Sequence, residues 1–282
     1  MVQAVSNIDA DRAHYSTTNK VPVNLAGTAT KPYTLVFPAQ TQTPAKALNL
    51  SPQGDGYATM TVNVNGTVSL TGKLADETTL TASAPLSKLN LWPIFAQLYT
   101  LKGSIAGMAA LTDADGITED VIGTNLQWFR PTQNVQWYPN GWPAGISVDV
   151  NGARYVVPPA TPLPVPSVFP GLLAVNATTG NATLTFTGGL LNPLPLPYNI
   201  NISTANLMTN APVAVSPTML IDKASGKITG TFTHTDGPTI KPAYQGVIIQ
   251  KGSKQGGWGY FMSRAAPLTG LGESGKVQVL AK

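Results

Sequence analysis

The chain has 282 residues and a mass of 29.5 kDa, and 43% of its residues are hydrophobic whereas only 11% are charged. This composition excludes a disordered chain, which needs low hydrophobicity and a high net charge, because the net charge here is only +4. The positive charge forms no basic stripe, which argues against nucleic acid, and the absence of cysteine excludes disulfides, thiolate metal sites and a cysteine nucleophile.

The first clear element is a β-hairpin. Residues 57–64 alternate between apolar and polar side chains, which predicts a strand with Met60, Val62 and Val64 on one face. Asn65-Gly66 follows, and residues 67–74 resume the alternation. Because Asn and Gly both tolerate a positive φ, this pair predicts a type I′ turn between two antiparallel strands.

The same pattern recurs along the chain. It is found at 147–157 around Asn151-Gly152, at 181–186, at 219–232 around Ser225-Gly226, and at 246–249. Residues 92–101 fit a helix or a strand equally well. Prolines interrupt the uncharged stretch 155–221 and exclude a membrane-spanning helix there. The expected fold is all-β, with antiparallel hairpins forming a barrel or a sandwich.

The hairpins also indicate an internal repeat. Asp76 follows Gly66 by ten residues, and Asp236 follows Gly226 by ten residues. This spacing predicts two duplicated halves, which form one barrel or two lobes. The expected organisation is an N-terminal extension or edge strands at 1–45, a first half at 46–155, a proline-rich connection at 156–172 and a second half at 173–282.

Several segments are punctuated by glycine and aromatic residues. They are Gly56-Tyr57-Ala-Thr-Met-Thr-Val, Gly72-Lys-Leu-Ala-Asp76, Leu98-Tyr99-Thr-Leu-Lys102-Gly-Ser104, the loop from Trp128 to Gly145, and Gln250-Lys251 through Gly259-Tyr260-Phe261 to Ser274-Gly275. With them, residues 50 to 280 resemble β-rich modules of large secreted or cell-surface bacterial proteins. Where those modules usually carry Asp-Gly, this chain has Asp76-Glu77. The resemblance implies an extracellular or cell-surface location and no catalytic residue.

The richest aromatic cluster lies between residues 126 and 143. Aromatic rings stack on the apolar faces of sugars, and Asn, Gln and Arg side chains hydrogen-bond hydroxyl groups. The candidate ligand-binding residues are therefore Trp128, Arg130, Trp137, Tyr138 and Trp142. The alternative is that these rings belong to the core at one end of the sheet structure.

A second cluster is acidic. Asp113, Asp115 and Asp120 lie close together around Gly116, and Asp-x-Asp-Gly resembles the start of a calcium-binding loop. The later ligands of that loop type are missing, so a solvated acidic turn is the alternative. Calcium is the one cofactor that the sequence suggests.

Evidence for catalysis is sparse. His234 and Asp236 are two residues apart and would share one face of a strand, but a Ser-His-Asp site also requires a nearby serine, and no Gly-x-Ser-x-Gly turn occurs. Asp149 is the further acid of interest, because it projects from a strand near the aromatic loop. The catalytic candidates are Asp149, His234 and Asp236.

These observations leave three functions open. The first is a secreted or cell-surface module for binding or adhesion, whose partner is a glycan or a neighbouring surface protein. The second is an extracellular hydrolase that acts on polysaccharide or ester bonds. The third is a structural spacer with no ligand.

Overall fold

A computed structural model describes residues 13–22, 25, 32–38, 40, 50–112, 118–158, 167–234, 240–264 and 270–282. Within these ranges the protein is all-β, as predicted, and no helix in them is long and apolar enough to span a membrane. The strands are β1 (Tyr33–Phe37), β2 (Gly56–Val62), β3 (Thr67–Lys73), β4 (Thr79–Pro85), β5 (Leu91–Leu98), β6 (Gly103–Leu111), β7 (Val121–Arg130), β8 (Trp142–Arg154), β9 (Ala182–Gly188), β10 (Tyr198–Ile202), β11 (Met208–Asn210), β12 (Thr218–Ile221), β13 (Lys227–Thr231), β14 (Ala243–Ile249), β15 (Gly256–Arg264) and β16 (Gly272–Ala281).

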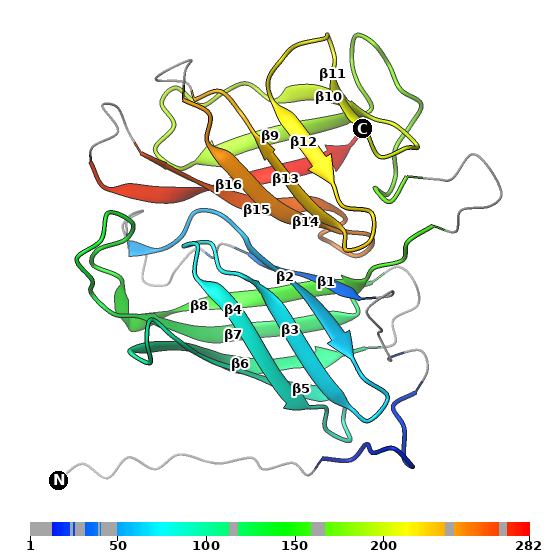
Figure 1. Ribbon diagram of the computed structural model, residues 1–282, viewed down its shortest axis with the longest axis vertical. Helices are drawn as coiled ribbons and strands as arrows, with labels where there is room; N and C mark the ends of the chain where they lie inside the picture. The colour runs from blue at the N-terminus through cyan, green and yellow to red at the C-terminus, as the bar shows by residue number, and fades with distance from the viewer. Residues whose placement is uncertain are drawn as a thin grey trace.

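The strands form two antiparallel sheets of eight. We call β1–β8 the first lobe and β9–β16 the second lobe, and the two lobes are stacked along the long axis of the molecule (Figure 1). Each sheet is a meander in which the first strand pairs with the last, β1 with β8 and β9 with β16. Each therefore curls into a nearly closed, barrel-like shape. The remaining sheet edges are β4 and β5 in the first lobe, and β11 and β12 in the second.

The predicted hairpin is present, but its turn differs from the expected one. β2 pairs with β3 from Tyr57↔Lys73 to Val62↔Val68. The first strand ends at Val62, the turn occupies residues 63–66, and only Gly66 has a positive φ, of 83°. Met60 and Val62 are buried as expected, whereas Val64 lies in the turn and is 52% exposed.

The turn predicted at Asn151-Gly152 is wrong, because β8 runs through both residues without a break. Gly152 pairs with Leu35 on β1 and with Val121 on β7. A Cβ atom built at Gly152 would lie 2.1 Å from Leu35 Cδ2. Here glycine is required because a neighbouring side chain lies over it, and not because the chain turns. Residues 92–98, which fitted a helix or a strand, lie in β5.

The two halves share one ring-like topology, but the repeat seen in the sequence aligns strands at different places in it. The hairpin at Gly66 joins the second and third strands of the first lobe, whereas the hairpin at Gly226 joins the fourth and fifth strands of the second. β1 lies in the segment expected to form an extension or edge strands, and it pairs on both sides, with β2 and with β8.

Each lobe has its own hydrophobic core. Alternate residues along the strands point inward, for example Trp92, Ile94, Ala96 and Leu98 on β5. In the second lobe, Phe186, Phe232 and Phe261 pack against one another, and the ring centroids of Phe186 and Phe232 are 4.0 Å apart. The interiors are thus filled by side chains.

A third cluster joins the lobes. Its buried members come from both sheets, with Val36, Tyr57, Ala75 and Ala153 from the first lobe and Val247, Ile249, Trp258 and Tyr260 from the second. Polar contacts accompany it: Thr34 Oγ1 donates to Ile248 O at 2.7 Å, and Tyr57 Oη donates to Gln245 Oε1 at 2.9 Å. Since apolar packing and buried hydrogen bonds both cross the junction, the lobes form a continuous body.

Candidate functional site

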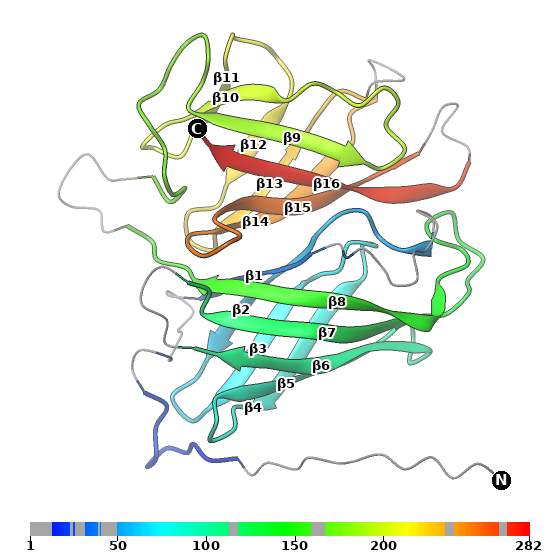
Figure 2. The ribbon, with the colours of Figure 1, turned by 180° about the vertical axis from the view of Figure 1, so that it is seen from behind.

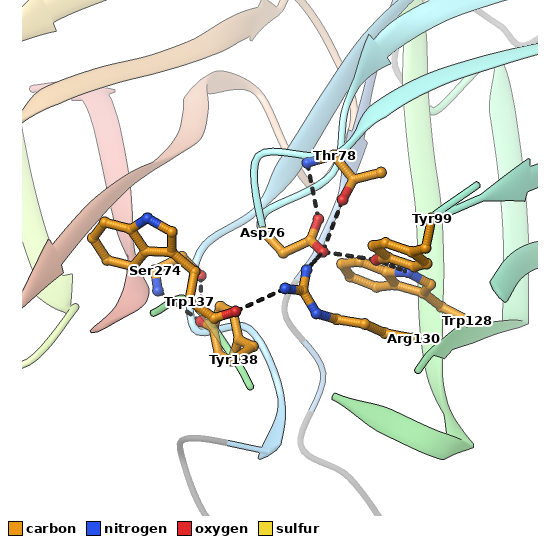
Figure 3. Close-up of polar contacts among 8 residues, drawn as sticks. All are labelled: Asp76, Thr78, Tyr99, Trp128, Arg130, Trp137, Tyr138 and Ser274. Carbon is orange, nitrogen blue, oxygen red and sulfur yellow. Dashed lines mark hydrogen bonds and ion pairs between the residues drawn. The ribbon is translucent and has the colours of Figure 1, made fainter. Parts of the chain in front are cut away.

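The predicted ligand-binding residues gather around one buried ion pair. Arg130, at the end of β7, forms an ion pair with Asp76 in the turn between β3 and β4, and their side chains are 5% and 0% exposed (Figure 3). The guanidinium also donates from Nη2 to Trp137 O at 2.7 Å. Asp76 further accepts hydrogen bonds from the Thr78 backbone N–H at 3.0 Å and the Thr78 hydroxyl at 2.9 Å. A buried charge needs such partners, because its desolvation is otherwise costly.

Tyr99 extends this network. Its hydroxyl donates to Asp76 Oδ2 at 2.7 Å and accepts from Trp128 Nε1 at 2.9 Å. Burial, followed by the negative charge of Asp76, raises the pKa of Tyr99 far above its ordinary value of 10.0. The tyrosine is therefore a neutral hydrogen-bond donor across the accessible pH range.

Aromatic rings enclose the guanidinium. Arg130 Cζ lies 5.1 Å from the ring centroid of Tyr99, 5.6 Å from that of Trp142 and 5.9 Å from that of Tyr138. Trp128, Tyr138 and Trp142 are at most 2% exposed. Of the five predicted contact residues only Trp137 is partly exposed. The loop is therefore packed into the protein, and its rings do not form a flat surface for stacking.

The same loop reaches the second lobe. The Tyr138 hydroxyl and Ser274 Oγ are 2.9 Å apart, and the Ser274 backbone N–H donates to the Tyr138 hydroxyl at 2.6 Å (Figure 3). Trp137 forms a bridge with Gly272, and its ring lies 4.5 Å from Arg264 Cζ. The Arg130–Asp76 pair thus holds a loop that joins the two lobes.

Asp149 supports an irregularity in the sheet. The register between β7 and β8 shifts between Gly123 and Leu126, and Asn125 in this bulge has a φ of 58°. Asp149 Oδ1 accepts a hydrogen bond from the Asn125 backbone N–H at 3.0 Å. The carboxylate satisfies a donor that the bulge removes from the ladder.

His234 is brought next to a serine that the sequence did not indicate. Its Nε2 lies 2.8 Å from Ser263 Oγ on β15, and the two residues are 2% and 4% exposed. Glu273 pairs with Ser263 across β15 and β16, and burial raises the pKa of its carboxyl group. This polar group lies at one end of the second-lobe interior, where it is closed off from solvent. Asp236 lies outside the described residues.

Of the three acidic residues predicted to bind calcium, the structure describes only Asp120. Asp113 and Asp115 lie outside the described residues. Asp120 is 6% exposed, its Oδ1 pairs with Lys251 Nζ at 2.7 Å, and its Oδ2 accepts from the Arg154 backbone N–H at 2.6 Å. In the part of the chain that the structure describes, no three His, Asp or Glu side chains gather as they would around a metal ion.

A surface that sequence reasoning missed lies on the outer face of β5–β8, which Figure 2 shows toward the viewer. Phe95 on β5 is 59% exposed, Met108 on β6 is 46% exposed, and Phe129 on β7 is 36% exposed. Gln97 and Gln127 are exposed beside them. We call these five residues the outer platform. The sequence signal for this surface was the alternation of side chains along each strand. The inward-facing positions of β5 and β7 already carry large apolar residues, so Phe95 and Phe129 must face outward.

The side chain of Gln127 is fixed in place by two contacts. Its Nε2 donates to Ser147 Oγ on β8 at 3.0 Å and to Asn125 O at 3.2 Å. Its amide oxygen can still accept hydrogen bonds. The platform therefore combines exposed rings with an oriented amide, which is a combination that binds polar ligands with apolar faces.

No protein-family model, curated protein or solved structure matches the chain in comparisons with known proteins.

Proposed function

We propose that the protein is a binding module of a secreted or cell-surface protein and that it contacts its ligand through the outer platform. The observation that carries the proposal is the exposure of Phe95, Met108 and Phe129 on one sheet face. Phe95 and Met108 lie on neighbouring strands and Phe129 lies on the next strand, so the three exposed apolar groups share one face of a rigid sheet, which is typical of interaction surfaces. Extracellular or cell-surface location remains part of the proposal and is supported by the sequence resemblance.

Binding is preferred to hydrolysis because Asp149, the catalytic acid candidate that the structure describes, and the buried acids Asp76 and Asp120 already have intramolecular partners. Asp76 neutralises Arg130, Asp120 pairs with Lys251, and Asp149 holds the bulge at Asn125. A glycosidase needs two carboxyl groups that face a sugar across an open cleft. Asp76 and Asp120 are buried, and Asp149 lies on the outer face of β8 with no second carboxyl group among the described outward-facing residues of β5–β8.

The test measures retention of the intact protein on immobilised polysaccharides and on purified surface proteins. Replacing both Phe95 and Phe129 by alanine should abolish retention while the protein stays folded, with only a small fall in the melting temperature from the lost packing of Phe129 on Gly145. The matched control is Leu220→Ala on β12 of the second lobe, which removes a side chain that is 73% exposed and far from the platform in sequence. Unchanged retention of the double variant would refute the platform as the contact surface, and no retention of the wild type on any matrix would favour the spacer.

A further inference from the structure

The register of three strands gives the outer platform a defined pattern. Phe95 is paired with Ala106, and Ser104 is paired with both Gln97 and Phe129. Ala106 is also paired with Gln127. Each row across the sheet therefore holds one ring, one small residue of β6 and one glutamine. In the next row the ring and the glutamine exchange sides.

Small neighbours let the rings lie against the sheet. Phe95 is opposite Ala106, which leaves room beside the phenyl ring. Gly145 on β8 lies beneath Phe129: a Cβ atom built there would be 2.8 Å from Phe129 Cε1, and its φ of 82° also favours glycine. The Phe129 ring packs on Gly145 and is still 36% exposed, so part of it is available for stacking.

The two rings are too far apart for one sugar unit to cover both. They lie on strands separated by β6 and are offset by two residues, so their Cα atoms are about 12 Å apart, given strand spacings of ~4.8 Å and a rise of ~3.3 Å per residue. A chain of several linked sugars can stack on both rings at once. Phe95 and Phe129 occupy one diagonal of this four-residue pattern, and Gln97 and Gln127 occupy the other. The glutamines are therefore within reach of hydroxyl groups at the rims of the stacked sugars.

Charge decides between classes of glycan. Among the described outward-facing positions of β5–β8, from Leu91 to Asn151, the only ionisable side chain is Asp149. Acidic polysaccharides need cationic partners, and Asp149 would repel them. Lys88 and Lys102 lie in the turns at either end of β5 and not on its face.

From this pattern we infer that the ligand of the outer platform is a neutral polysaccharide, bound as a chain of several sugars stacked on Phe95 and Phe129. This inference rests on the proposed function and adds the ligand class. Because no ion pair takes part, the affinity should change little between 50 and 500 mM salt, conditions that weaken charge-driven binding strongly.

The experiment is affinity electrophoresis of the full chain in native gels that contain a soluble neutral polysaccharide, hydroxyethylcellulose or galactomannan, or an acidic one, alginate or polygalacturonate. Retardation is expected in a neutral gel and not in the acidic gels. Phe95→Ala and Phe129→Ala should each weaken retardation at least tenfold, Gln97→Ala should weaken it several-fold, and Leu220→Ala should leave it unchanged. Monosaccharides should not compete, whereas the matching oligosaccharides should.

The outcomes separate this inference from the proposed function. Retardation that is equal for wild type and the Phe95 and Phe129 variants, or stronger in acidic gels, would overturn the neutral-glycan assignment. Retention on a surface protein that depends on Phe95 and Phe129, with no neutral gel retarding the chain, would also overturn it while leaving the platform as a binding surface. Loss of both kinds of binding would refute the proposed function itself.

Discussion

Tyr138 of the first lobe and Ser274 of the second are joined by two hydrogen bonds, one between the hydroxyl groups at 2.9 Å and one from the Ser274 backbone N–H to the tyrosine oxygen at 2.6 Å. Tyr138 is 1% exposed and Ser274 is 0% exposed. The contact lies beside the apolar cluster of the junction, so an aromatic loop that reads as a binding motif in sequence instead connects the lobes.

Tyr138→Phe should lower the free energy of unfolding by about 1–3 kcal/mol, because it removes the acceptor of the buried Ser274 N–H. The Ser274 hydroxyl loses one contact and keeps its hydrogen bonds from the Gln53 and Gly54 backbone N–H groups. Urea titration followed by fluorescence measures the change. Tyr198→Phe is the control, since Tyr198 is half-buried and its hydroxyl makes no hydrogen bond within the described residues. Equal stability of the two variants would show that the contact contributes nothing.

Asp76→Asn should destabilise the protein by about 3–5 kcal/mol, because it leaves the buried Arg130 guanidinium without a counter-charge. Thermal unfolding measures this loss. Lys73→Ala is the control, since it breaks the exposed pair of Lys73 with Glu77 and should change stability by less than about 1 kcal/mol. Similar effects of the two substitutions would contradict the structural role assigned to the Asp76–Arg130 pair.

Two glutamates should have opposite effects on stability as the pH changes. Burial raises the pKa of Glu273 above 4.5, so its ionisation costs stability as the pH rises through that raised pKa. A hydrogen bond from Ser253 lowers the pKa of Glu119 below 4.5, so its charge contributes stability that is lost as the pH falls through the lowered pKa.

Glu273→Gln should therefore raise the melting temperature at pH 7, whereas Glu119→Gln should lower it. Melting curves between pH 3.5 and 7 check this, and each difference from wild type should shrink once the pH is below both pKa values of the residue concerned. If the melting temperature at pH 7 changed in the same direction for both variants, the surroundings of Glu273 and Glu119 would not have opposite effects on the stability of the ionised carboxylate.

Ser263→Ala should cost about 1–3 kcal/mol, because it removes the hydrogen-bond partner of the buried His234 ring nitrogen. The variant should be compared with wild type in urea unfolding and in an assay with chromogenic esters. Ester hydrolysis by the wild type that disappears in Ser263→Ala, with no loss of stability, would make the pair a nucleophile and base and would revive the hydrolase alternative.

Alternation predicted the strands well because a half-buried strand must place apolar residues at every second position. The role of the aromatic loop was harder to read. Leu126, Trp128 and Arg130 share one parity on β7 and face the interior, but an arginine at such a position suggests exposure until its counter-charge is known. That partner, Asp76, is 54 residues away and meets Arg130 only in the folded sheet.

The glycines also show that some roles depend on residues that are distant in sequence. Gly66 and Gly226 mark hairpin turns as predicted, with φ values of 83° and 72°. Gly152 lies within a strand beneath Leu35, and nothing local distinguishes it from a turn glycine. Likewise, His234 and Ser263 are on separate strands or strand ends, and only the sheet order brings them together.

Pairing the first strand of each lobe with its last has a mechanical consequence. Tyr33 is paired with Arg154, and Ala182 with Ala281, so the chain enters and leaves each lobe at neighbouring points. Tension applied through these points would act across the β1–β8 and β9–β16 pairs, at right angles to the strands. The hydrogen bonds of each pair would then break one after another instead of sharing the load. Resistance to pulling would then fall to the packed junction between the lobes, where Tyr138 and Ser274 meet.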